Sequence, residues 1–176
     1  MSRIWTEATC DGDIDYLTRA TAAQATGATL HLVRVRAVEQ AQAMGVDHCF
    51  SSCSPANLRI LADAARYTGR FDLAEKSLLS LRRRSPGQAA AATFFLGRLY
   101  ESRGRSADAL RMYQQYLAGT PRGDYAEQSM AGRLRMLAAT PTSPAAQAAA
   151  EAYLRRFPDG VHAPLARRVL EGANAP

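Results

Sequence analysis

The sequence predicts an all-α fold, a solenoid of about three helical hairpins with a C-terminal capping helix. Three observations predict it: 35 of the 176 residues are alanine, a pattern of small, large and turn-forming residues recurs about every 35 positions, and apolar residues within each copy have helical spacing. An apolar content of 47% against 22% charged residues is typical of a folded chain rather than a disordered one.

The repeat is clearest between two neighbouring copies that are 35 residues apart. The matching pairs are Leu61 and Leu96, Ala62 and Gly97, Ala65 and Tyr100, Gly69 and Gly104, Ala74 and Ala109, Leu78 and Tyr113, Leu81 and Tyr116, and Pro86 and Pro121. A third copy continues the series with Gly132 at an offset of 35, and with Ala146, Tyr153 and Pro158 at an offset of 37. We therefore expect two extra residues between the helices of the third copy, at about residues 140–143.

The second copy shows how each unit forms a helical hairpin. Its first helix carries an apolar stripe at i, i+3, i+4 and i+7 and ends at Gly104, where a positive φ has little steric cost. Ser106 is predicted to cap the second helix. Gly97 and Ala109 are small enough for the two helices to approach closely, and we expect Tyr113 to fill the space beside them. Because one hairpin cannot cover its own apolar stripe, the copies are expected to stack.

These copies resemble the tetratricopeptide repeat (TPR) family, in which a Leu-Gly-x2-Tyr element, an Ala-x3-aromatic element and a proline recur. The second copy carries all of these elements, with Leu96, Gly97, Tyr100, Ala109, Tyr113 and Pro121. The third copy departs from the pattern, because Arg135 stands at the Tyr position and Ala150 at the aromatic one. The resemblance covers residues 55–160 and implies a right-handed α-α superhelix. Residues 153–160 also resemble the repeat endings of TPR proteins from the Gram-negative cell envelope.

The repeats divide the chain into six segments. We expect TPR 1 at residues 55–88, TPR 2 at 90–123 and TPR 3 at 125–160. Residues 1–28 are expected to be an irregular stretch with room for one helix. Residues 29–54 are expected to form a degenerate half-repeat helix followed by a loop, and residues 161–176 a capping helix with a tail. Within 29–54, residues 30–36 also alternate like a strand, but a helix is the prediction beside a helical stack.

The resemblance implies that a partner binds on the concave face of the superhelix, along the first helix of each repeat. The predicted partner-binding residues on this face are Arg59, Asp63, Arg66, Phe94, Arg98, Glu101, Ser129, Arg133 and Met136. Four of them are arginines, whose planar guanidinium groups suit carboxylates, so an acidic or C-terminal peptide is the expected ligand. The alternative is that these arginines are solvated or pair with Asp63 and Glu101.

One cluster has residue types suited to a metal. His48, Cys49 and Cys53 lie within six residues, and imidazole and thiolate groups are common zinc ligands. Because no fourth ligand is close in sequence, we expect a loop with two small, partly buried thiols rather than a metal site, and no cofactor. The three cysteines of the chain are an odd number and are expected to be reduced.

The predicted function is a non-enzymatic scaffold or adaptor that binds a peptide or protein segment. No sequence pattern places a nucleophile beside a base that a third group orients, and no phosphate-binding Gly-rich loop is visible. Two alternatives stay open: a nucleic-acid or anionic-surface binder, favoured by the net charge of +6 and the run Arg82-Arg83-Arg84, and a homo-oligomeric structural module.

Location is predicted from what the sequence lacks. No run of about 18 apolar residues is present, so no membrane span is expected. The first thirty residues hold several acidic side chains and no export signal is visible among them, which makes the cytoplasm the default prediction. If the chain is a fragment of an exported protein, the prediction becomes the cell envelope.

Overall fold

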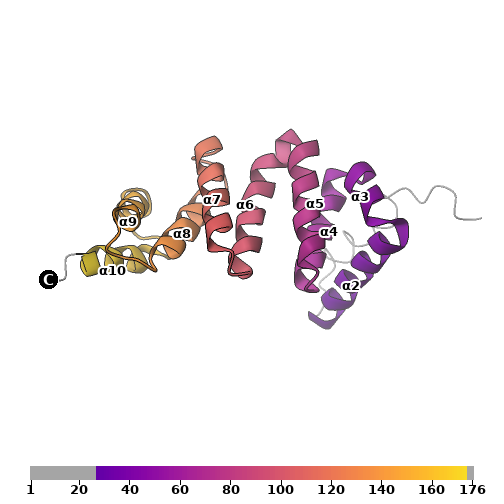
Figure 1. The fold of residues 1–176 in the computed structure, drawn as a ribbon, viewed down its shortest axis with the longest axis horizontal. Helices are drawn as coiled ribbons and strands as arrows, with labels where there is room; N and C mark the ends of the chain where they lie inside the picture. The colour runs from indigo at the N-terminus through magenta and orange to yellow at the C-terminus, as the bar shows by residue number, and fades with distance from the viewer. Residues whose placement is uncertain (1–26, 174–176) are drawn as a thin grey trace, which may run out of the picture. The chain divides into compact units, whose positions relative to one another are not determined.

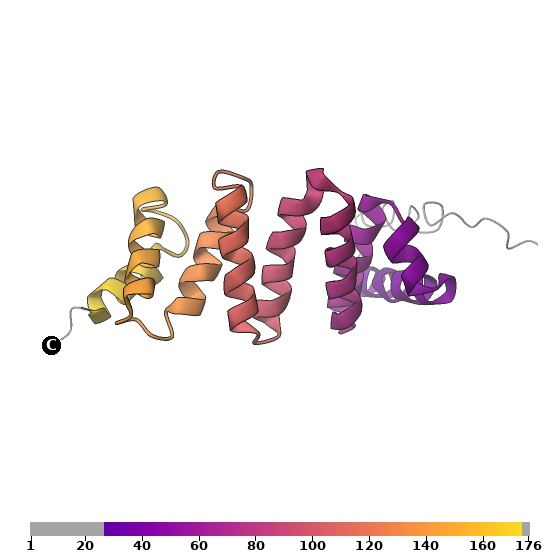
Figure 2. The same ribbon diagram turned by 45° about the horizontal axis from the view of Figure 1, so that its top comes forward.

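The computed structural model describes residues 27–173, and the all-α prediction is confirmed within this range, where every regular element is a helix. The helices are α2 (Gly27–Met44), α3 (Val46–Ser52), α4 (Pro55–Tyr67), α5 (Phe71–Arg84), α6 (Pro86–Ser102), α7 (Ser106–Gly119), α8 (Ala126–Leu137), α9 (Pro144–Arg156) and α10 (Ala163–Ala173), joined by short loops (Figures 1 and 2). The predicted irregular segment 1–28, with its one helix, lies outside the described residues except for positions 27 and 28, which begin α2.

The chain divides within α6 into two compact units, residues 1–92 and residues 93–176. In the first unit α4 packs against both α2 and α5, and α3 lies against α2 and α5. The core of this unit is formed by Leu58, Leu61, Ala65, Ala74 and Leu81, all of which are buried. Helix α2 includes the stretch that alternates like a strand, so the helix prediction holds there. The loop expected before residue 55 is wrong for residues 46–52, which form α3.

The turns between paired helices follow the prediction from the repeat. Gly69 and Gly104 have φ angles of 75° and 68°, a region that glycine enters without a Cβ clash, and each ends the first helix of its pair. In the third copy α8 ends at Leu137 and α9 begins at Pro144, so this turn is longer, as the change of offset predicted. The cap at Ser106 is wrong: the N-cap of α7 is Arg105, whose side chain pairs with Asp108 at 2.8 Å instead.

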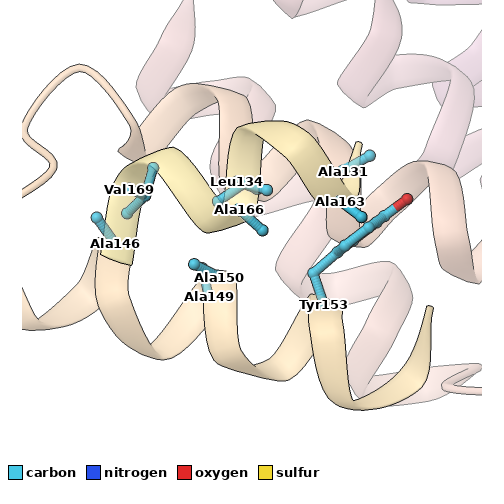
Figure 3. Packing of buried hydrophobic residues seen from close by; sticks show 9 residues of the cluster. All are labelled: Ala131, Leu134, Ala146, Ala149, Ala150, Tyr153, Ala163, Ala166 and Val169. Carbon is cyan, nitrogen blue, oxygen red and sulfur yellow. The ribbon is translucent and has the colours of Figure 1, made fainter. Parts of the chain in front are cut away.

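The core of the second unit is built mostly from small side chains. Figure 3 shows them pointing toward one another from α8 (Ala131 and Leu134), α9 (Ala146, Ala149, Ala150 and Tyr153) and α10 (Ala163, Ala166 and Val169). Alanine side chains let the helices approach closely, and Tyr153 supplies the largest buried volume in this cluster. Helix α10 covers α9 with its apolar side while Arg167 and Arg168 remain exposed, as expected of a capping helix.

One tyrosine ring fills the space between three helices of the second unit. Tyr113 on α7 is fully buried, with Gly97 of α6 against one edge of its ring and Gly132 of α8 against the other. A Cβ atom built on Gly97 would lie 2.8 Å from Cε1 of Tyr113, and one built on Gly132 would lie 2.4 Å from Cε2. The close approach predicted beside Gly97 is therefore confirmed, and it extends to the equivalent glycine of the next copy.

Candidate functional site

A polar cleft of about 650 Å³ opens in the second unit between α6, α8 and the turn that precedes α10. Its lining consists of Arg98, Glu101, Ser102, Glu127, Gln128, Arg135, Val161 and His162. Helices α6 and α8, the first helices of consecutive copies, both contribute, and the ion pair between Glu101 and Arg135 joins them at the cleft. Five of the eight lining side chains carry an ionisable group, so the cleft offers charges of both signs.

The floor of the cleft is a bidentate ion pair between α6 and α8. Arg135 donates from Nε to Oε1 of Glu101 at 2.8 Å and from Nη2 to Oε2 at 3.0 Å. The hydroxyl of Tyr113 also donates to Oε2 of Glu101. Two parallel hydrogen bonds between a guanidinium and a carboxylate fix both groups in one plane, so this pair holds α6 and α8 in register at the cleft.

Burial and hydrogen bonding act in opposite directions on the carboxylate of Glu101. Partial burial raises its pKa, but the hydrogen bonds from Arg135 and Tyr113 outweigh burial, and the pKa lies below its ordinary value. For Tyr113 the two effects agree: burial and the hydrogen bond to ionised Glu101 both raise the pKa of the phenol. At neutral pH the centre of the cleft is therefore an ionised carboxylate, a guanidinium and a neutral phenol.

The far wall of the cleft is held by the hydroxyl of Tyr153 on α9. This hydroxyl donates to Oε1 of Glu127 at 2.9 Å and accepts a hydrogen bond from the backbone N–H of His162 at 3.2 Å. Nε2 of His162 in turn lies 3.4 Å from Nη1 of Arg135. One phenol thus fixes a carboxylate of α8 and the backbone of the turn before α10, both of which line the cleft.

The same tyrosine contact occurs one repeat earlier, where no cleft residue is involved. Tyr116, which precedes Tyr153 by 37 residues, accepts a hydrogen bond from the backbone N–H of Tyr125 at 3.0 Å. A Cβ atom on Gly123 would lie 2.5 Å from the Tyr116 hydroxyl oxygen, and one on Gly160 would lie 2.5 Å from that of Tyr153. The sequence repeat is therefore also a repeat of contacts within this unit.

Replacing Tyr153 by phenylalanine is expected to loosen the turn before α10 while leaving the helices folded. The ring still fills its site, but the N–H of His162 loses its acceptor and Glu127 loses a donor, at a cost of roughly 1–2 kcal/mol. Hydrogen exchange measures this directly: the amide of His162 should exchange faster, and that of Tyr125 should not. Tyr116→Phe is the matched control and should give the reverse pattern. Equal acceleration of both amides in either variant would contradict it.

The structure separates the six predicted partner-binding residues of the second unit into three groups of two. Arg98 and Glu101 line the cleft. Phe94 and Ser129 are core residues with exposed fractions of 3% and 0%, so the prediction that they face an open groove is wrong. Phe94 is covered by the ring of Tyr125, stacked at 4.4 Å between centroids.

The remaining two predicted residues of this unit, Arg133 and Met136, are half-buried on α8, outside the lining of the cleft. Nε of Arg133 is buried, and none of the described residues offers it a hydrogen bond. Helix α8 therefore turns a different side toward the cleft from the one that the repeat positions indicated, and Glu127, Gln128 and Arg135 occupy that side.

In the first unit, Arg59, Asp63 and Arg66 lie on α4. Arg66 pairs with Asp63 at 3.0 Å, and Arg34 of α2 approaches the same carboxylate at 3.8 Å. The guanidinium groups of Arg34 and Arg66 also lie over the ring of Tyr67, 3.5 and 4.1 Å from its centroid. Arg66 therefore pairs with Asp63, as the alternative to partner binding predicted.

The histidine and cysteine cluster is part of helix packing in the first unit. Cys49 of α3 is a fully buried free thiol whose pKa is raised by burial. Cys53 is disulfide-bonded, so the expectation of reduced thiols is wrong for this residue. Nδ1 of His48 lies 3.4 Å from Oγ of Ser52 on the exposed side of α3. Within residues 27–173, no three His, Cys, Asp or Glu side chains are grouped as metal ligands.

Arginines at the ends of second helices bind backbone carbonyls of earlier segments. Nη1 of Arg84 donates to the carbonyl oxygens of Phe50 at 3.2 Å and Cys53 at 2.8 Å. Arg156 donates to the carbonyl oxygen of Pro121 in the same manner. The last residue of the run Arg82-Arg83-Arg84 therefore caps α3 instead of standing free for a phosphate.

Comparison with known proteins gives no family for this chain. No protein-family model matches the sequence, and no curated protein is significantly similar to it. Among the described helices, none is long and apolar enough to cross a membrane. The inference of function therefore depends on the helices, the repeated contacts and the cleft.

Proposed function

We propose that the chain is a TPR-like helical-repeat protein, without enzymatic activity, that binds a peptide or protein segment in the cleft of its second unit. The observation that carries this proposal is the placement of Arg98, Glu127 and Gln128 on consecutive first helices that line one cleft. A guanidinium, a carboxylate and a primary amide side by side suit the side chains and backbone of a polypeptide.

The repeated contacts support the TPR-like part of the proposal. The predicted segments 55–88, 90–123 and 125–160 each contain two helices, namely α4 with α5, most of α6 with α7, and α8 with α9. Glycine or alanine recurs at one position in each copy, as Ala62, Gly97 and Gly132, and each of them is buried. Small residues at the helix contact are what a stack of hairpins requires.

The alternative of an arginine-driven nucleic-acid binder gains less support. Counterion release requires arginines that are free to meet phosphates. Arg84 and Arg156 are engaged with backbone carbonyls, and Arg66 and Arg135 with carboxylates. A polynucleotide would also approach Glu101 and Glu127 at the cleft, which would repel it.

The proposal is tested by affinity capture with a charge reversal in the cleft and a matched one outside it. Arg98→Glu and Arg122→Glu change the net charge equally, and both side chains are exposed, but only Arg98 lines the cleft. We expect the wild-type chain and Arg122→Glu to retain the same proteins from nuclease-treated lysate of the source cells, and Arg98→Glu to lose them. Identical capture by all three chains would contradict the proposal. Capture that disappears with nuclease would favour the nucleic-acid alternative.

A further inference from the structure

We infer that the cleft selects a protein segment that carries both a carboxylate and a positively charged side chain, rather than a purely acidic segment. This inference rests on the proposed function and names the chemistry of the ligand. It follows from which charges of the cleft are already satisfied within the chain and which remain open to a partner.

Glu101 and Arg135 balance each other's charge within the chain. Both oxygens of Glu101 accept hydrogen bonds from Arg135, at 2.8 and 3.0 Å, and Oε2 also accepts one from Tyr113. The remaining nitrogen of Arg135, Nη1, lies 3.4 Å from His162. The outer N–H groups of Arg135 can still meet a ligand, but the positive charge of the guanidinium is already balanced by Glu101 through a bidentate pair, which is among the stronger side-chain interactions. The arginine at the floor of the cleft therefore does not make the site acid-selective.

The open charges are one of each sign. Arg98 is exposed and forms none of the hydrogen bonds or ion pairs among the described residues, and its charge reaches Glu101 only at longer range. Glu127 is half-buried and its Oε1 accepts from Tyr153, a neutral donor that leaves the carboxylate charge uncompensated. Arg98 belongs to α6 and Glu127 to α8, and both line the same cleft. A ligand that meets both needs a negative group facing α6 and a positive group facing α8.

The two remaining lining groups favour a polypeptide over a small charged molecule. The exposed amide of Gln128 both donates and accepts hydrogen bonds, as a peptide backbone requires. Val161 has 86% of its surface exposed at the edge of the cleft, an apolar contact for an aliphatic side chain of the ligand. A purely acidic peptide would place like charges near Glu127, and this repulsion provides discrimination against it.

The inference is tested with a random 12-residue peptide library displayed on phage and panned against the full chain. We expect enriched peptides to contain at least one acidic and one basic residue. An enriched set that is purely acidic or purely basic would overturn the inference and leave the proposed function standing. Absence of any enriched peptide would contradict the proposed function itself, so the two failures are distinguishable.

Synthetic versions of one enriched peptide then assign each charge to its partner. Replacing the acidic residue of the peptide by its amide, or its basic residue by Gln, should each weaken binding to the wild-type chain roughly three- to tenfold. Arg98→Glu should cause no further loss for the peptide without its acid. Glu127→Gln, which keeps a carbonyl oxygen for Tyr153, should cause none for the peptide without its base.

Two control variants in the same unit show that the effect is local. Arg122→Glu and Glu151→Gln make the same charge changes at exposed positions outside the cleft and should leave all peptide affinities within about twofold of wild type. If the losses of binding free energy from a peptide change and from a cleft variant simply added, the charges of the peptide would not contact Arg98 and Glu127. That result would overturn the inference. Fluorescence anisotropy at two salt concentrations measures every affinity.

Discussion

Gly132→Ala is expected to lower the Tm by roughly 5–10 °C. The new Cβ would lie 2.4 Å from Cε2 and 2.6 Å from Cζ of Tyr113, closer than carbon atoms approach without displacement. The ring has no room to retreat, because it is fully buried, touches Gly97 at its other edge and donates its hydroxyl to Glu101. Thermal unfolding followed by circular dichroism measures the loss.

Three comparisons separate this steric effect from helix propensity. Alanine favours a helix over glycine by about 1 kcal/mol, so Gly87→Ala in α6, with nothing within 4 Å of its Cβ, should be neutral or stabilising. Gly97→Ala should destabilise less than Gly132→Ala, since its closest contact is 2.8 Å. Tyr113→Leu should make Gly132→Ala less damaging, as a double-mutant cycle reveals. If Gly132→Ala and Gly87→Ala had equal effects, the close contact would not exist.

The sequence was sufficient to predict the paired helices of the repeats and the packing of Tyr113 beside Gly97, because both depend on spacing; the contact with Gly132 was not predicted. A period of 35 residues places Gly97 and Gly132 at equivalent positions, and the Ala-x3-aromatic element brings Tyr113 beside them. The longer turn between α8 and α9 followed from the offset of 37 for the same reason. Local rules predicted less well: Ser106 has the residue type of a cap, but it is the first residue of α7, and the N-cap is Arg105.

Of the residues that line the cleft, the sequence predicted only Arg98 and Glu101, because tertiary contacts rather than repeat positions decide which side chains line it. Phe94 occupies an exposed position of the repeat, yet stacking on Tyr125 draws it into the core. Arg135 was visible as a departure from the aromatic pattern, and 34 residues before it stands Glu101, its ion-pair partner. A charged residue at the Tyr position is thus a signal from which the site could have been found, although Arg135 was not among the predicted site residues. His162 gave no such signal in the sequence.

Glu101→Gln is expected to destabilise the chain by roughly 1–3 kcal/mol at neutral pH. It leaves the guanidinium of Arg135 without its bidentate partner at a position where the two side chains are only 31% and 20% exposed. An exposed pair provides the matched control: Glu151 and Arg155 are 3.5 Å apart and more than half exposed, so Glu151→Gln should produce no measurable change. Urea denaturation at pH 7 gives both values.

The stabilisation from Glu101 should also depend on pH in a defined direction. Its pKa in the folded chain lies below the ordinary value of 4.5, so the unfolded chain binds a proton first as the pH falls. The contribution is complete above about pH 4.5 and disappears as the pH falls below it through the lower folded pKa. Wild type should therefore lose stability more steeply with acid than Glu101→Gln does, and the two stability curves should converge at low pH. Parallel curves between pH 6 and pH 3 would show that Glu101 is not held as an ion by Arg135 and Tyr113. The cleft would then lack the charge-balanced ion pair whose presence leaves Arg98 and Glu127 as the charges for a partner.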